Sequence, residues 1–94
     1  MTKADVISSI ADQTGVDKTN VQDTLEAFFS VVKDSLAKGE NIYVRGFGSF
    51  VNKKRAQKVA RNISKNTAIV IDEHYVPSFK PAKVFVEQVK GTVK

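Results

Sequence analysis

The chain has 94 residues, of which 41% are hydrophobic, and its 15 basic and 10 acidic side chains give a formal net charge of +5. This length allows one domain with a small core. The chain has no cysteine and a single histidine, which excludes a disulfide scaffold, a cysteine nucleophile and a multi-histidine metal site within one chain. No apolar run is long enough to cross a membrane and no signal-peptide pattern opens the chain, so we expect a cytoplasmic protein.

The charges are unevenly distributed along the chain. Residues 1–40 carry a net charge of −3, and residues 72–94 carry a net charge of +1. Between them, residues 41–71 contain seven basic side chains and no acidic one. A solvated surface loop normally mixes both signs of charge, so this middle third predicts a polyanionic partner.

The N-terminal forty residues predict two helices. Thr2 and Asp5 have the spacing of a capping box, and Gly15 is placed to end the first helix. Asp17 is placed to cap the second helix, in which apolar residues recur at helical spacing. Four acids lie between residues 17 and 38, which argues against a helix-turn-helix that brings this helix to phosphates. We expect both helices to serve in packing.

After the second helix the apolar pattern changes to that of strands. We expect strands over residues 41–59 and 67–76, paired as a hairpin with its tip at 60–66. Pro77 is expected to end the sheet, and Pro81 to lie in the first turn of a short closing helix. The outgoing strand is basic, and basic residues along a two-stranded ribbon can follow the phosphates on both sides of a groove.

Motifs of catalysis are missing from the sequence. The Gly46-Phe47-Gly48 segment lacks the third glycine and the following helix of a dinucleotide-binding loop, and no phosphate-binding P-loop is present. His74 follows two acids, Asp72 and Glu73, which is typical of solvated polar surface. We therefore expect no enzyme activity, no catalytic residues, no metal site and no cofactor.

Several motifs stand in a fixed order along the chain: Arg45-Gly46-Phe47-Gly48-Ser49-Phe50, Arg55-Ala56, Arg61-Asn62, Val76-Pro77-Ser78-Phe79-Lys80-Pro81 and Lys83. Together they resemble the bacterial HU/IHF family of histone-like, DNA-bending nucleoid proteins, and the resemblance covers nearly the whole chain. It implies an α+β fold and an intertwined dimer, with a two-helix body, a three-stranded antiparallel sheet extended into a β-ribbon arm, and a short C-terminal helix.

The resemblance also implies how the single domain, residues 1–94, is organised. Residues 1–40 would form the helical dimerisation body, residues 41–76 the sheet and DNA-binding arm, and residues 77–94 the C-terminal helix. The arm would enter the minor groove while lysines of the body touch the flanking phosphates. The candidate DNA-binding residues are Lys3, Arg45, Lys53, Arg55, Lys58, Arg61, Asn62, Ile63, Lys80 and Lys83.

The tip of the arm departs from the family pattern. The family usually carries a proline that wedges between base pairs, and this chain has Ile63 at that position. We expect Ile63 to take the role of the wedge, because an aliphatic side chain can enter a base step. Ala60, Asn66 and Ala82 replace glycines that are common in the family.

We therefore expect a histone-like protein that binds duplex DNA through the minor groove with little sequence specificity, and that bends and compacts it in the bacterial nucleoid. A homodimer is expected, with a heterodimer formed with a paralogue as the alternative. Three other functions remain open: an IHF-like, site-preferring DNA-bending protein, a module for structured RNA, and a structural protein whose basic ribbon binds an acidic partner.

Overall fold

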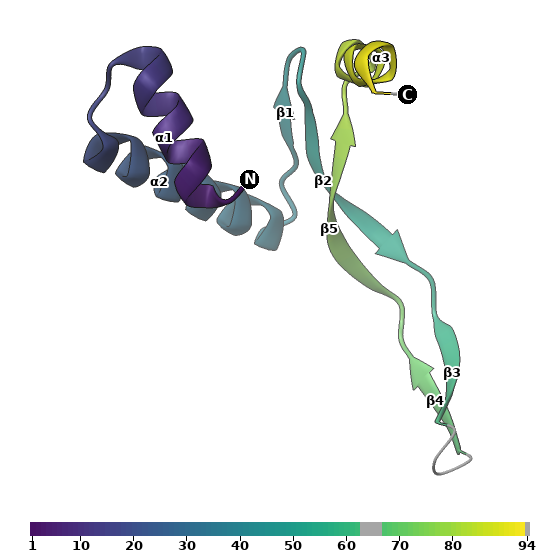
Figure 1. Cartoon of the computed structure of the whole chain (residues 1–94). Coiled ribbons are helices and arrows are strands. Elements are labelled where there is room, and N and C mark those ends of the chain that lie inside the picture. The colour runs from purple at the N-terminus through teal and green to yellow at the C-terminus, as the bar shows by residue number, and fades with distance from the viewer. Residues whose placement is uncertain (63–66, 94) are drawn as a thin grey trace. The chain divides into compact units, whose positions relative to one another are not determined.

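The computed structural model describes residues 1–62 and 67–93 and divides the chain into two compact units, Met1–Ser35 and Leu36–Lys94. Figure 1 labels the helices and strands of both units. None of the helices in the described part of the chain is long and apolar enough to cross a membrane. In chain order the elements are α1 (Lys3–Thr14), α2 (Lys18–Ala37), β1 (Ile42–Val44), β2 (Gly48–Arg55), β3 (Lys58–Asn62), β4 (Thr67–Ile71), β5 (His74–Pro81) and α3 (Lys83–Thr92).

The two ends of α1 have the caps that the sequence predicts. The backbone N–H of Asp5 donates to Thr2 Oγ1 (3.3 Å), and the backbone N–H of Thr2 donates to Asp5 Oδ2 (2.9 Å), which completes the capping box. Hydrogen bonding with Thr2, first with its backbone and then with its side chain, holds the pKa of Asp5 below its ordinary value. Gly15 ends the helix in the left-handed conformation, at φ 75°.

Helix α2 begins directly after Asp17, as the sequence predicts. The Asp17 carboxylate accepts a hydrogen bond from the backbone N–H of Thr19 (3.2 Å), and the Asp17 carbonyl accepts one from Val21 (2.9 Å). Gly39, at φ 84°, lies just past the end of the helix, where its backbone N–H donates to the Leu36 carbonyl (3.0 Å).

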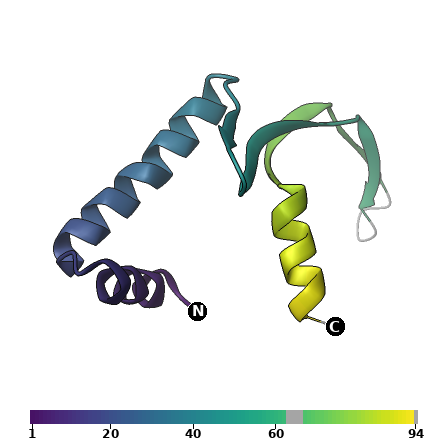
Figure 2. The ribbon, with the colours of Figure 1, turned by 90° about the horizontal axis from the view of Figure 1, so that it is seen from above.

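Strands β1, β2 and β5 form an antiparallel sheet with β2 in the middle. Strands β3 and β4 form a second, two-stranded antiparallel ribbon. The register is the same in both, because Arg55 pairs with His74 at the end of the first and Lys58 with Ile71 at the start of the second. Two residues on each strand separate these pairs, so the hairpin continues without an inserted residue. Figure 2 shows the paired strands curving as they leave the sheet.

The expected single strand over residues 41–59 is wrong. Gly46 has φ 78°, and the backbone N–H of Phe47 donates to the Val44 carbonyl (3.1 Å), so the chain turns between β1 and β2. Only glycine adopts such a φ at little cost, which makes Gly46 the residue that allows the turn. The ladder is interrupted a second time between β2 and β3, at residues 56 and 57.

Both prolines lie in places other than those expected. Pro77 does not end the sheet, because it lies within β5 and pairs with Asn52. Strand β5 is an edge strand, where a residue without an N–H donor is tolerated. Pro81 is the last residue of β5, and α3 begins only at Lys83. The backbone N–H of Ala82 donates to the Phe47 carbonyl (2.9 Å). This hydrogen bond holds Ala82, the residue before the helix, beside the turn between β1 and β2.

The apolar packing of the second unit centres on four aromatic rings. Phe47 lies within 5.1 to 6.5 Å, between ring centroids, of Phe50, Phe79 and Phe85. Even so, among the described side chains only two hydrophobic ones are buried, Ile7 and Val21, and both belong to the first unit. The single chain therefore leaves most of its large apolar side chains partly in contact with water.

Candidate nucleic-acid interface

The pairing register gives the β1-β2-β5 sheet two faces of different chemistry. Residues directly opposite each other on neighbouring strands point to the same face, and so do alternate residues along one strand. Ser49 pairs with Tyr43 on one side and with Lys80 on the other. The surface that follows from this pairing, which we call the basic face, consists of Tyr43, Ser49, Val51, Lys53 and Arg55 with Val76, His74, Ser78 and Lys80.

The opposite face of the sheet carries the aromatic cluster. Phe50 pairs with Ile42 and Phe79, and the Phe50 and Phe79 rings lie 5.2 Å apart between centroids. The Phe79 ring also contacts that of Phe85 in α3 (6.3 Å). Since these rings pack on one side of the sheet, the exposed side chains of Lys53 and Arg55 remain available to solvent on the other.

A hollow of about 610 Å³ lies where the basic face meets the turn between β1 and β2. Arg45 and Lys80 supply the cationic side chains of its wall, and Tyr43 and Ser49 line it as well. None of the described residues that line it is acidic. The cationic side chains of Arg45 and Lys80 therefore suit the hollow to bind a phosphate group.

Lys83 is the first residue of α3. Ala82 precedes it at the N-cap position without a side-chain hydrogen bond, and the first turn has no acid. The partial positive charge of the helix N-terminus adds to the charge of Lys83. Lys80 and Lys83 thus bring two cations to the same end of β5.

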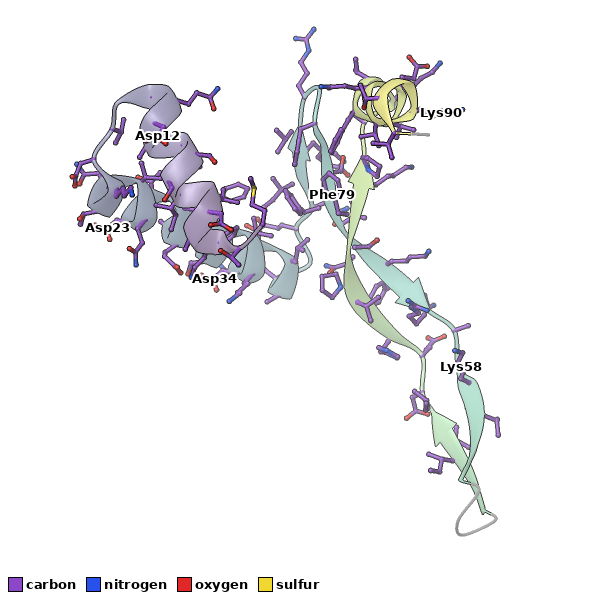
Figure 3. The ribbon with its side chains drawn as sticks, in the orientation of Figure 1. Asp12, Asp23, Asp34, Lys58, Phe79 and Lys90 are labelled. Carbon is purple, nitrogen blue, oxygen red and sulfur yellow. The ribbon has the colours of Figure 1, made fainter. Side chains whose placement is uncertain are left out.

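The ribbon carries the next group of predicted residues. Lys58 is exposed and begins β3, and Figure 3 shows it farther along the ribbon, away from α3, than Phe79. Arg61 pairs with Ala68 and Asn62 with Thr67 in the backbone ladder. The described side chains end at Val59 and begin again at Ile69. Ile63 lies outside the described residues.

Lys3 lies in the other compact unit, at the start of α1. Its ammonium group forms an ion pair with the Glu26 carboxylate of α2, and both side chains are about half exposed. An exposed pair of this kind contributes little to stability. It leaves Lys3 accessible to a phosphate at the small cost of giving up the pairing with Glu26.

The register also sorts residues that sequence reasoning passed over. Lys54 points to the face opposite Lys53, where its ammonium lies 3.4 Å from the carboxylate of Glu73. His74, interpreted from sequence as plain polar surface, pairs with Arg55 on the basic face. The face on which each of these two side chains lies depends on the register of the hairpin, which the sequence alone does not give.

No group of three or more His, Cys, Asp or Glu side chains that could hold a metal ion occurs within residues 1–62 and 67–93. The candidate interface instead combines an extended basic ribbon, a sheet with one cationic face, and Lys83 at the start of α3. This arrangement is typical of proteins that bind nucleic acid by its phosphates.

Comparisons with known proteins identify the family. The family model described as "Bacterial DNA-binding protein" matches residues 1–90. DNA-binding protein HU of Thermotoga maritima is 38% identical over 90 residues, which cover 96% of this chain and all of that protein. Integration host factor subunit beta of Psychromonas ingrahamii is 39% identical over 92 residues, 97% of each chain. The chain therefore belongs to the bacterial DNA-binding protein family that includes HU and the integration host factor subunits.

The fold agrees with this assignment. HU of Anabaena, crystallised with DNA, superimposes with a TM-score of 0.89 at 28% identity, covering 95% of this chain and 97% of that one. The α+β class expected from the sequence is confirmed, and so are the resemblance to the HU/IHF family and the assignment as a histone-like DNA-binding protein.

Proposed function

We propose that this chain binds duplex DNA as a dimer with little sequence preference, bends it, and thereby compacts the bacterial nucleoid. The observation that carries the proposal is the sorting of the sheet into an aromatic face and a basic face with Lys53, Arg55 and Lys80. Because the aromatic rings pack on one face of the sheet, the cations of the opposite face can contact a duplex. Lys58, Arg61 and Asn62 would then follow the minor groove, as the family resemblance implies.

Contacts outside the arm complete the proposed interface. Arg45 and Lys80 would bind a phosphate at the hollow beside the β1–β2 turn. Lys83 and Lys3 would bind phosphates along the flanks of the site. Because these groups meet phosphates and not base edges, they orient the duplex without reading its sequence.

A dimer is supported by the apolar surface that each unit leaves open. In the first unit, Ile10, Leu25 and Phe28 line an apolar hollow of about 400 Å³. In the second, Phe79, Phe85 and Val89 line another of about 490 Å³. Apolar hollows of this size on a small chain favour a partner surface that covers them. A second copy of the chain is the simplest partner, and a paralogue with the same fold is the alternative.

The proposal is tested by gel shifts on linear, nicked and pre-bent duplexes of one length and several sequences. We expect similar affinity for all sequences and tighter binding to nicked and pre-bent DNA, because less free energy is needed to bend those duplexes. Strong preference for one linear sequence would instead identify a site-preferring protein. Tighter binding to duplex RNA than to DNA of equal length would identify an RNA-binding module, and no salt-sensitive binding to either would reject the proposal.

Bending depends on Ile63 in this proposal. Replacement of the side chain in Ile63→Ala removes the group that would enter a base step, whereas Ile63→Pro restores the residue usual in the family. Fluorescence transfer between duplex ends measures the bend, and gel shifts measure the affinity. We expect Ile63→Ala to reduce the bend more than the affinity and Ile63→Pro to keep the bend. An unchanged bend in Ile63→Ala would assign bending to phosphate neutralisation alone.

A further inference from the structure

The only histidine of the chain lies on the basic face. His74 is the first residue of β5, it is exposed, and its partner across the ladder is Arg55. Lys53 lies diagonally opposite on the same face of β2. A polyanion that contacts Arg55 and Lys53 therefore comes within reach of the imidazole.

One ring nitrogen of His74 is already engaged within the chain. Nδ1 lies 2.9 Å from the carbonyl oxygen of Asp72, and a carbonyl oxygen can only accept a hydrogen bond. Nδ1 is therefore the nitrogen that carries the proton in the neutral ring, which leaves Nε2 as an acceptor. A neutral His74 thus offers a lone pair, and not a proton, to an approaching phosphate.

Protonation reverses this chemistry. The imidazolium has an N–H at both nitrogens, so Nδ1 keeps its bond to Asp72 while Nε2 becomes a charged donor. Charge-assisted hydrogen bonds to phosphate are among the stronger ones in proteins. Histidine exchanges this proton near physiological pH, whereas lysine and arginine stay charged throughout that range.

Charged groups of both signs lie near His74. Arg55 and Lys53 on β2 share its face and repel an imidazolium. Asp72 and Glu73 connect β4 to β5 just before His74, and the Glu73 carboxylate is paired with Lys54. Phosphates bound by Arg55 and Lys53 would neutralise that repulsion and add an attraction of their own.

We propose that His74 is a proton-linked DNA contact: binding of the phosphate backbone is coupled to uptake of a proton at Nε2, so that affinity rises as the pH falls. The inference rests on the proposed DNA binding and adds to it a residue and a dependence on pH. Because the chain has one histidine, the difference in proton uptake between the unmodified protein and a variant without the imidazole is assigned to His74.

The test compares the unmodified protein with His74→Gln and His74→Lys on one duplex at constant ionic strength. His74→Gln is permanently neutral and His74→Lys permanently charged, and both retain the α-amino group. We expect the unmodified protein to bind roughly tenfold more tightly for each arm at about pH 5.5 than at about pH 7.5. His74→Gln should stay at the weaker affinity and His74→Lys at the tighter one, each with little dependence on pH.

Titration calorimetry in two buffers of different ionisation enthalpy measures the proton count directly. We expect uptake by the unmodified protein and none beyond the α-amino contribution in either variant. Circular dichroism checks that the exposed substitutions leave the fold intact. Equal dependence on pH in the unmodified protein and His74→Gln would overturn the inference while leaving DNA binding in place. Absence of DNA binding at every pH would overturn the inference together with the proposed function.

Discussion

The rings of Phe47 and Phe85 stack with their centroids 5.3 Å apart and their planes 17° from parallel. This contact ties α3 to the turn between β1 and β2, alongside the hydrogen bond from Ala82 to the Phe47 carbonyl. Yet 44% of Phe47 and 38% of Phe79 remain exposed in the single chain. The aromatic cluster is thus well formed internally but covered on only part of its surface.

We expect that this cluster is completed by a second chain and that no stable folded monomer exists. Sedimentation equilibrium at low micromolar concentration should give the mass of two chains, and the urea midpoint should rise with protein concentration. Phe85→Ala should lower the free energy of unfolding by about 3–5 kcal/mol, because it removes the ring by which α3 contacts both Phe47 and Phe79. Val84→Ala, at a side chain that is 66% exposed on the same helix, should change it by less than about 0.5 kcal/mol.

A folded species with the mass of one chain would contradict the dimer. Equal effects of Phe85→Ala and Val84→Ala would show instead that the aromatic cluster does not hold the fold together.

Gly48 provides a test of the sheet itself. A Cβ atom at this position would lie 2.6 Å from the Lys80 carbonyl oxygen and 2.6 Å from the Phe79 ring. Because one of these neighbours is backbone, it cannot move aside cheaply, and Gly48→Ala should destabilise the protein by about 1–3 kcal/mol. The matched substitution is Gly91→Ala in α3, where a Cβ meets nothing within 4 Å.

Gly91→Ala should be neutral or stabilise by up to about 1 kcal/mol, because alanine favours helix over glycine. Chemical denaturation of both variants at one protein concentration measures the difference. A Gly48→Ala protein as stable as the unmodified one would mean that β2 and β5 approach less closely than the structure indicates.

Local signals were enough to predict both ends of α1 and the start of α2. The capping residues Thr2, Asp5, Gly15 and Asp17 act through neighbours four or fewer residues away, so their roles can be inferred without the fold. The overall order of helices, sheet and ribbon followed from the change in apolar period and from the family resemblance.

The positions of the prolines and the faces of the sheet could not be predicted in this way. Whether a strand tolerates Pro77 depends on its being at an edge, which is a property of the whole sheet. The separation of Lys53 from Lys54, and the pairing of His74 with Arg55, depend on a register that a shift of one residue would invert. These features depend on pairing between residues that are far apart in the chain, so they cannot be inferred from composition or local pattern.

The capping box predicts how stability depends on pH. Hydrogen bonds from Thr2 lower the pKa of Asp5 in the folded chain, so ionised Asp5 adds stability at pH values above its unfolded pKa of about 3.9. That contribution is lost as the pH falls through the lower, folded pKa. Asp5→Asn should therefore be less stable than the unmodified protein at neutral pH, and the difference should shrink as the pH falls through the lowered pKa of the folded chain.

Urea denaturation across this pH range measures the effect, with Asp12→Asn as the control for charge. Asp12 lies in α1 beyond the first turn, so its substitution removes the same charge without removing the cap. A stability difference for Asp5→Asn that stays constant down to the lowest pH would assign the effect to something other than the ionised carboxylate.

Lys53 and Lys54 provide the sharpest test of the basic face, because they are adjacent, identical in chemistry and turned to opposite sides of β2. Lys53 shares its face with Arg55, whereas Lys54 is held 3.4 Å from Glu73. If only one face meets the duplex, Lys53→Ala should weaken DNA binding several-fold and make the plot of log affinity against log salt shallower by about one unit for each arm. Lys54→Ala removes the same charge from the chain and should leave the slope nearly unchanged. Gel shifts at four or more salt concentrations separate these outcomes. Equal changes of slope in the two variants would mean that the ribbon binds by its total charge alone, and that the face defined by the register has no part in recognition.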